Sequence, residues 1–254
     1  MLLWPTARRF HPLSGRGLFR PGWRLAAALL ALGGLMGGLV PGNGQALARD
    51  KTGTVAITFD DLPAYTILPD QTFVDRLNTD LLAGLKRHHI PATGFVVEGK
   101  LDELVRARQI AVLKNWQKAG MGLGNHTFSH ESPNTLGAQA YIADIAKGEP
   151  VTRSLLAARH QRLTWFRHPY LETGKDAATQ RTINDWLAAH RYRVAPVTID
   201  ADDWEFAEPY DDAIAHHNDA RRAEIRAEYL AYTEAMIGWS QEAGKALFGA
   251  ISRW

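Results

Sequence analysis

The feature that most constrains the fold of this chain is a regular alternation of short β-like runs and helical stretches after residue 50. The β-like runs are short and mostly apolar, and the first is rich in β-branched residues. They span residues 54–58, 92–97, 121–125, 165–166 and 194–199, the last as one or two short strands. Strands that alternate with helices predict a parallel sheet within an α/β fold.

Six helical stretches lie between or after these runs: residues 73–88, 102–119, 136–147, 151–159, 176–190 and 213–240, the last as one long helix or a helix pair. In the first stretch Phe73, Leu77, Leu81 and Leu85 recur at every fourth position, so they predict its buried face. Without the first 48 residues, which have the features of a leader described below, about 206 residues remain. That length is enough for one domain with a substantial core.

Polar side chains gather directly after four of the expected strands, at residues 60–61, 125–130, 167–170 and 200–204. The carboxyl ends of parallel strands meet at one rim, and α/β barrels and open α/β sheets both build their sites there. The sequence therefore predicts a functional site at this rim.

Two histidines and a carboxylate within these clusters suggest a metal site. His126 and His130 are four residues apart, which would place both imidazoles on one face of a helix. With one carboxylate of the Asp60–Asp61 pair they would offer a ligand set that suits zinc and leaves one position open for water. Taken singly, an Asp-Asp pair is more typical of a turn, and two histidines at this spacing are more typical of a partly exposed surface.

The first 48 residues are expected to be a secretory signal peptide. Five arginines precede an apolar run over residues 25–40, and Ala46-Leu47-Ala48 provides a cleavage pattern of small residues. The run has 16 residues, whereas a stable membrane span needs roughly 20. Permanent anchoring is therefore the weaker alternative. We expect contact with a membrane only during export, and a final location in the periplasm or outside the cell.

The charge of the chain depends on this leader. The whole chain has 29 basic and 27 acidic residues, and five of the basic ones belong to the leader, so the remainder has a net charge of about −3. A nucleic-acid partner is not expected, because it would need a clustered basic face. The chain has no cysteine, which excludes disulfides and a lipid anchor on cysteine.

Four segments, in this order, resemble the NodB-homology family of polysaccharide deacetylases, carbohydrate esterase family 4. They are TFDD at 58–61, HTFSH at 126–130, RHPY at 167–170 and DADDW at 200–204. The resemblance implies a distorted (β/α) barrel of about seven strands, with its site at the carboxyl-end rim. It also implies hydrolysis of an N-acetyl group, or less typically an O-acetyl group, on an oligo- or polysaccharide.

The resemblance assigns the central roles residue by residue. Asp61, His126 and His130 would hold one divalent metal ion, with zinc expected first and cobalt or another ion as alternatives. Asp60 would be the general base that takes a proton from the attacking water, and Arg167 would hold Asp60 in position.

The same resemblance assigns the remaining site residues. The backbone N–H of Tyr170 would stabilise the oxyanion, and Pro169 would fix the backbone that aims it. Asp203 would bond Arg167 or otherwise tune the Arg167–Asp60 pair. Trp204 and Pro169 would line the substrate side.

The chain departs from the family pattern near its end. The family has a further Leu-x-His motif whose histidine supplies the general acid, but Leu247 is followed by Phe-Gly, and no histidine follows His217. We therefore expect a barrel that lacks a final strand and helix. Either the chain is a truncated or frameshifted product, which its abrupt end favours, or this branch has lost the acid.

Three alternatives to an active polysaccharide deacetylase follow from these observations. The chain could be a non-catalytic carbohydrate-binding relative, since the acid motif is absent. It could be an amidohydrolase for a small amide that is not a sugar, because the same site chemistry serves C–N hydrolysis generally. It could also be an α/β domain in which the four motifs coincide by chance.

Overall fold

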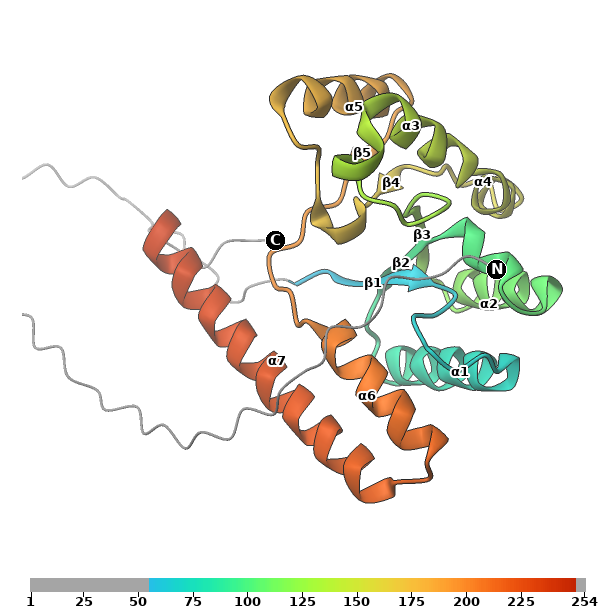
Figure 1. Ribbon diagram of the computed structural model, residues 1–254, viewed down its shortest axis with the longest axis vertical. Helices are drawn as coiled ribbons and strands as arrows, with labels where there is room; N and C mark the ends of the chain where they lie inside the picture. The colour runs from blue at the N-terminus through green and yellow to red at the C-terminus, as the bar shows by residue number, and fades with distance from the viewer. Residues whose placement is uncertain (1–54, 250–254) are drawn as a thin grey trace, which may run out of the picture. The chain divides into compact units, whose positions relative to one another are not determined.

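The computed structural model describes residues 55–249, so the expected signal peptide at residues 1–48 lies outside the described residues. Five strands form one sheet: β1 (Ile57–Leu62), β2 (Ala92–Val96), β3 (Gly122–Asn125), β4 (Trp165–Phe166) and β5 (Arg193–Val194). They are arranged in chain order and every neighbouring pair is parallel (Figure 1). The predicted α/β class with a parallel sheet is confirmed.

The sheet has fewer strands than the barrel of about seven that was expected. Within residues 55–249 it has five, and β1 and β5 each have one neighbour, so it does not close into a barrel. The expected strand at 194–199 is reduced to Arg193–Val194. Ala195 still donates its N–H to the Phe166 carbonyl at 2.8 Å, but the regular pairing of β5 with β4 ends at Val194.

The helices connect these strands and then continue past the last one. Two short 3₁₀ helices, η1 (Glu98–Asp102) and η2 (Pro169–Leu171), follow β2 and β4. The α-helices are α1 (Gln71–Arg87), α2 (Arg106–Lys118), α3 (Pro133–Lys147), α4 (Pro150–Ala157), α5 (Ala177–Ala189), α6 (Asp203–Ala215) and α7 (Asp219–Phe248). Among the residues that the structure describes, no helix combines the length and the apolar character needed to cross a bilayer.

The buried face of α1 differs from the predicted stripe. Of that stripe Leu85 is buried, whereas Leu77 is 41% exposed. The face turned to the core instead carries Gln71, Val74, Asn78, Leu82 and Leu85. Asn78 belongs there because its amide donates to the Pro63 carbonyl and its oxygen accepts the indole N–H of Trp116, both at 2.8–2.9 Å. Asn78, whose amide is hydrogen-bonded at both ends, thus lies on the buried face, and the neighbouring Leu77 of the predicted stripe is exposed.

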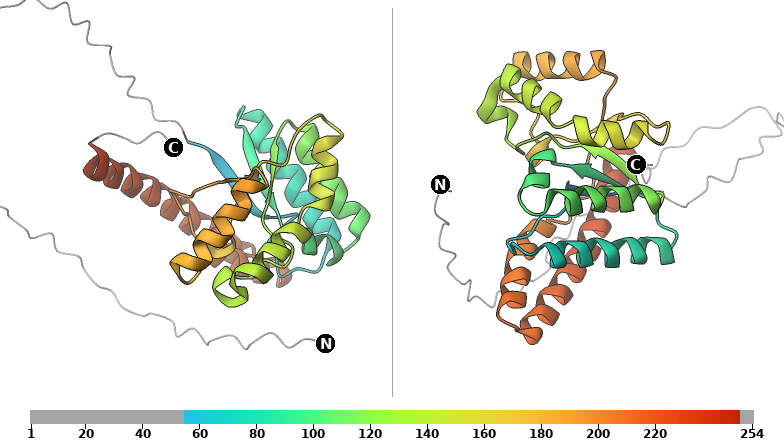
Figure 2. Two further views of the ribbon diagram at one scale, coloured as in Figure 1. Left: turned by 90° about the horizontal axis from the view of Figure 1, so that it is seen from above. Right: turned by 90° about the vertical axis from the view of Figure 1, so that its right-hand side faces the viewer.

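Helices α6 and α7 lie side by side as a pair after the last strand, as both ribbon views show (Figures 1 and 2). Asp211 of α6 is buried, and its Oδ2 accepts hydrogen bonds from the Thr66 hydroxyl at 2.5 Å and the Ile67 N–H at 3.0 Å. Tyr65 adds a bond from its hydroxyl to Glu208 at 3.1 Å. The loop that follows β1 is therefore fastened to α6.

Replacing Asp211 with alanine removes both of these hydrogen bonds at a buried position. Hydrogen bonds to a charged acceptor contribute about 1.5–3 kcal/mol each, so loss of the two should lower the unfolding free energy by roughly 3–6 kcal/mol. Equilibrium urea unfolding followed by circular dichroism measures this loss.

The neighbouring Asp212 provides the matched control. Its side chain is 67% exposed and pairs with His216 on the surface, where such pairs contribute at most about 1 kcal/mol. If Asp212→Ala lost as much unfolding free energy as Asp211→Ala, the loss would come from a disturbed helix α6 and not from the hydrogen bonds of Asp211.

Candidate metal and catalytic site

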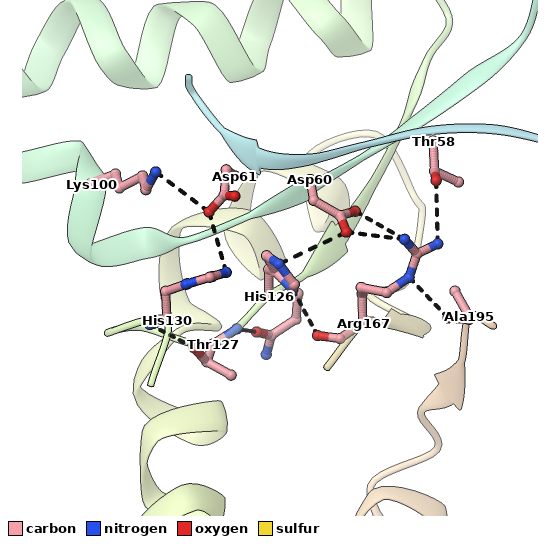
Figure 3. Close-up of polar contacts among 10 residues, drawn as sticks. Thr58, Asp60, Asp61, Lys100, His126, Thr127, His130, Arg167 and Ala195 are labelled. Carbon is pink, nitrogen blue, oxygen red and sulfur yellow. Dashed lines mark hydrogen bonds and ion pairs between the residues drawn. The ribbon is translucent and has the colours of Figure 1, made fainter. Parts of the chain in front are cut away.

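Two adjacent carboxylates at the end of β1 turn toward different partners. The pairing of β1 with β2 shifts register between Phe59 and Leu62, and Asp61 has a φ of 62°. Asp60 consequently faces Arg167, while Asp61 faces His130 (Figure 3). The two adjacent carboxylates therefore have different partners, Arg167 for Asp60 and His130 for Asp61.

The two histidines lie in a loop after β3, and the expectation that they share a helical face is wrong. Thr127 adopts a φ of 70°, and its hydroxyl accepts the His130 N–H at 3.0 Å. Its own N–H donates to the Asn125 side chain at 2.7 Å. This tight turn brings the two imidazole centroids to 4.9 Å, so a loop achieves the approach that a helix was predicted to provide.

The three predicted metal ligands are brought together. One donor atom each from Asp61, His126 and His130 lies within 4.8 Å of the other two. Within the described residues, buried Asp61 Oδ1 accepts no hydrogen bond, and its neighbours Lys100 Nζ and His130 Nε2 lie 3.4 and 3.5 Å away. A buried polar atom without a hydrogen bond is unfavourable. A divalent cation bound by this carboxylate would satisfy that atom, so the residues present fit the metal that was predicted.

The protonation of both histidines also suits a metal. His126 Nδ1 lies 2.8 Å from the Arg167 carbonyl, which can only accept, so Nδ1 carries the proton and Nε2 keeps its lone pair. Burial lowers the pKa of His126 to about 4. Burial also lowers the pKa of His130. Both imidazoles are therefore neutral near pH 7, which is the form that binds metal ions.

Asp60 is held beside this cluster by Arg167. Nη1 of the guanidinium lies 3.0 and 3.2 Å from the two carboxylate oxygens. Burial raises the pKa of Asp60 and the nearby charge of Asp61 adds to the rise, while Arg167 opposes it. Asp60 Oδ2 is also 4.0 Å from His126 Nε2, so this carboxylate lies next to the ligand cluster without belonging to it.

The turn after β4 presents Tyr170 to the same cluster. Tyr170 has a φ of 55°, and within the described part of the chain its N–H has no acceptor. Its ring packs edge-on against His130 with centroids 4.7 Å apart, and Pro169 before it is buried. Sequence reasoning gave no role to His168, which is buried and whose Nδ1 lies 3.0 Å from the Tyr141 hydroxyl. That contact fixes the turn to α3.

Asp203 and Trp204 lie in the first turn of α6. Asp203 is not among the partners of Arg167, whose guanidinium bonds Asp60, Thr58 and the Ala195 carbonyl. Burial, then the charges of Asp200 and Asp60, raise the pKa of Asp203. Its connection to the site is therefore electrostatic, through Asp60. The ring of Trp204 is 53% exposed, and no aromatic contact joins it to the three ligands in the described residues.

Sequence reasoning missed Lys100, which lies in η1 after β2. Its Nζ is 3.4 Å from Asp61 Oδ1 (Figure 3). It also donates to the Ala64 carbonyl at 3.2 Å. The available signal was its position a few residues beyond the end of a strand, at the same rim as the four polar clusters.

A match to a known protein family covers more than half of the chain, including residues 58–61, 126–130 and 167–170 but not residues 200–204. Residues 48–186 match the family model described as polysaccharide deacetylase. A chitin deacetylase of Colletotrichum lindemuthianum is 27% identical over 170 residues, which cover 67% of this chain and 60% of that protein. A peptidoglycan-N-acetylglucosamine deacetylase of Bacillus cereus is 24% identical over 151 residues, which cover 59% of this chain and 46% of that protein.

The chain spans about half the length of these curated relatives. Among solved structures, that of the chitin deacetylase from Colletotrichum lindemuthianum matches with a TM-score of 0.46 and 23% identity. The match covers 67% of this chain and 63% of the other.

The loop that carries both histidines packs closely against Gly148, which yields a test of the site. A Cβ at Gly148 would lie 2.4 Å from the Thr127 carbonyl carbon and 2.5 Å from its oxygen. Gly148→Ala should therefore displace the loop, lower stability by about 1–3 kcal/mol and weaken zinc binding. Urea unfolding and titration of the metal-free protein with zinc measure the two effects.

Gly84→Ala is the matched control, because a Cβ there meets nothing within 4 Å. Gly84 lies inside α1, where alanine favours the helix by up to about 1 kcal/mol. Unchanged zinc affinity in Gly148→Ala would contradict the assignment of this loop to the metal site.

Proposed function

The chain belongs to the polysaccharide deacetylase family, and from this premise we propose that it is a metal-dependent hydrolase that removes acetyl groups from N-acetylated carbohydrate. The observation that carries the proposal is the arrangement at the rim of the sheet. Three residues that could bind a metal converge there, and one of them has a buried oxygen that accepts no hydrogen bond within the described chain. A separate carboxylate held by an arginine lies beside them.

Asp61, His126 and His130 are proposed to hold one divalent ion, with zinc expected first for two imidazoles and a carboxylate. When bound, such an ion polarises the acetyl carbonyl and makes water more acidic. His126 is the most buried of the three ligands, and its Nδ1–H bond to the Arg167 carbonyl orients its free Nε2. Such outer hydrogen bonds fix the tautomer and direction of a ligand histidine.

Asp60 is proposed to be the general base. It is the carboxylate that remains free of the ligand cluster, and Arg167 holds both of its oxygens. Its raised pKa makes it a stronger base than an ordinary aspartate once it is deprotonated. Arg167 keeps the Asp60 carboxylate oriented, and its positive charge favours the ionised form of that carboxylate, which burial disfavours.

The turn after β4 is proposed to stabilise the negative charge that develops on the acetyl oxygen. The N–H of Tyr170 has no acceptor within the described chain, and a pre-positioned free donor of this kind suits an oxyanion. Trp204 is proposed to line the substrate side together with Pro169, and Asp203 to tune Asp60 through its charge.

The substrate class is proposed from the relatives. The two matched proteins are by name a chitin deacetylase and a peptidoglycan-N-acetylglucosamine deacetylase, so an N-acetylated oligo- or polysaccharide is the first substrate to test. The proposal includes export by a signal peptide at residues 1–48, which would place the enzyme where such polymers occur.

Acetate release from chito-oligomers and from peptidoglycan fragments tests the function directly. We expect release that chelation abolishes and that zinc or cobalt restores. Oligomer binding without any acetate release would instead favour a non-catalytic carbohydrate-binding relative. Release only from small amides that are not sugars would favour a general amidohydrolase.

The two adjacent aspartates should respond differently to the same substitution. Asp60→Asn should lower acetate release about 100- to 10,000-fold, the usual contribution of a general base, while zinc still binds. Asp61→Asn should instead lose zinc, because an amide is a poor substitute for a carboxylate ligand. Acetate assays paired with zinc titrations separate the two, and equal zinc loss in both variants would contradict the assigned roles.

A further inference from the structure

Lys100 places a positive charge against the carboxylate oxygen that the metal site needs. Its Nζ lies 3.4 Å from Asp61 Oδ1, and His130 Nε2 lies 3.5 Å from the same atom. The Lys100 side chain is only 16% exposed. Among the described residues, Lys100 is the lysine or arginine that pairs with this oxygen.

The position of Lys100 does not depend on Asp61 alone. Its ammonium also donates to the Ala64 carbonyl at 3.2 Å and lies 5.2 Å from the centroid of the Tyr65 ring. Tyr65 is held in turn by its bond to Glu208. These contacts keep the ammonium near Asp61 Oδ1 even when another cation approaches that oxygen.

We propose that Lys100 is an internal substitute for the metal ion, which neutralises Asp61 in the metal-free protein and competes with the ion for its Oδ1. The inference rests on the proposed function in that Asp61 must be a metal ligand. The same three ligands without Lys100 would bind the ion more tightly, and the metal-free site would be less stable.

Electrostatics gives the direction and the scale of the effect. A divalent ion bound by Asp61 would be repelled by an ammonium a few ångströms away, and even a water-like dielectric leaves an effect of about tenfold or more in affinity. In the metal-free protein the sign reverses, because Lys100 then compensates a partly buried carboxylate. Both effects make zinc add less stability to the wild type than to a protein without the lysine.

The test compares the full chain with its Lys100→Met variant, which keeps the length of the side chain and removes the charge. Both proteins are stripped with a chelator and titrated with zinc against a chromophoric competitor at one pH and ionic strength. We expect Lys100→Met to bind zinc about tenfold more tightly or better. We also expect zinc to raise its melting temperature more, since stabilisation grows with [L]/Kd.

Two controls isolate the charge at this position. Lys100→Arg keeps the charge and should stay near the wild-type affinity. Lys118→Met makes the same chemical change on an exposed residue in the last turn of α2, before β3 begins, and should leave the affinity unchanged.

The outcomes separate this inference from the function on which it rests. Equal or weaker zinc binding by Lys100→Met, with a wild type that binds zinc, overturns the role of Lys100 and leaves the metal site intact. Failure of both proteins to bind zinc overturns the metal site and this inference with it. Zinc binding by the Lys100→Met variant alone would be the extreme form of the expected result.

Discussion

The buried guanidinium of Arg167 joins the strands and the site. Its side chain and backbone reach four other strand ends, through contacts with Thr58, Asp60, Phe95, Asn125, His126 and Ala195. A buried charge without a partner would cost about 3–5 kcal/mol, so Asp60 is needed for stability as well as for its proposed chemistry. The carbonyl of the same residue orients His126. The fold therefore fixes the proposed base and one ligand through a single residue.

The rim holds backbone conformations that ordinary side chains rarely adopt. Asp61, Thr127, His130 and Tyr170 have φ values of 62°, 70°, 59° and 55°. Such residues cost about 1–3 kcal/mol each and persist where surrounding contacts enforce them. Four of the other left-handed residues directly follow helix ends, where this conformation is common: His89, His160, Arg191 and His217. The four at the rim have no such reason, so their clustering points to the site.

The rim location of the site could be predicted from the sequence, because a parallel sheet gathers its strand ends whatever their length. The local geometry could not. Histidines four residues apart can approach each other in a helix or in a tight loop. Here they lie in a loop, because Thr127 has a positive φ and its hydroxyl accepts the His130 N–H. Within the described residues the sheet has five strands instead of about seven, and β5 covers only Arg193–Val194 where a strand over 194–199 was predicted. The Lys100–Asp61 contact joins η1 to the end of β1, two segments distant in sequence, and no local pattern signals it.

The site has a deep half, whose side chains are almost fully buried, and a shallow half, whose side chains are partly exposed to solvent. The side chains of His126 and Arg167 are 2% and 4% exposed, and each is fixed by bonds to the strands. Those of Asp61, His130 and Lys100 are 19%, 21% and 16% exposed. An ion in the proposed site would be held in place by the deep half and would exchange through the shallow half. Lys100 belongs to the shallow half, where its ammonium lies 3.4 Å from Asp61 Oδ1 and would repel an ion bound by that carboxylate.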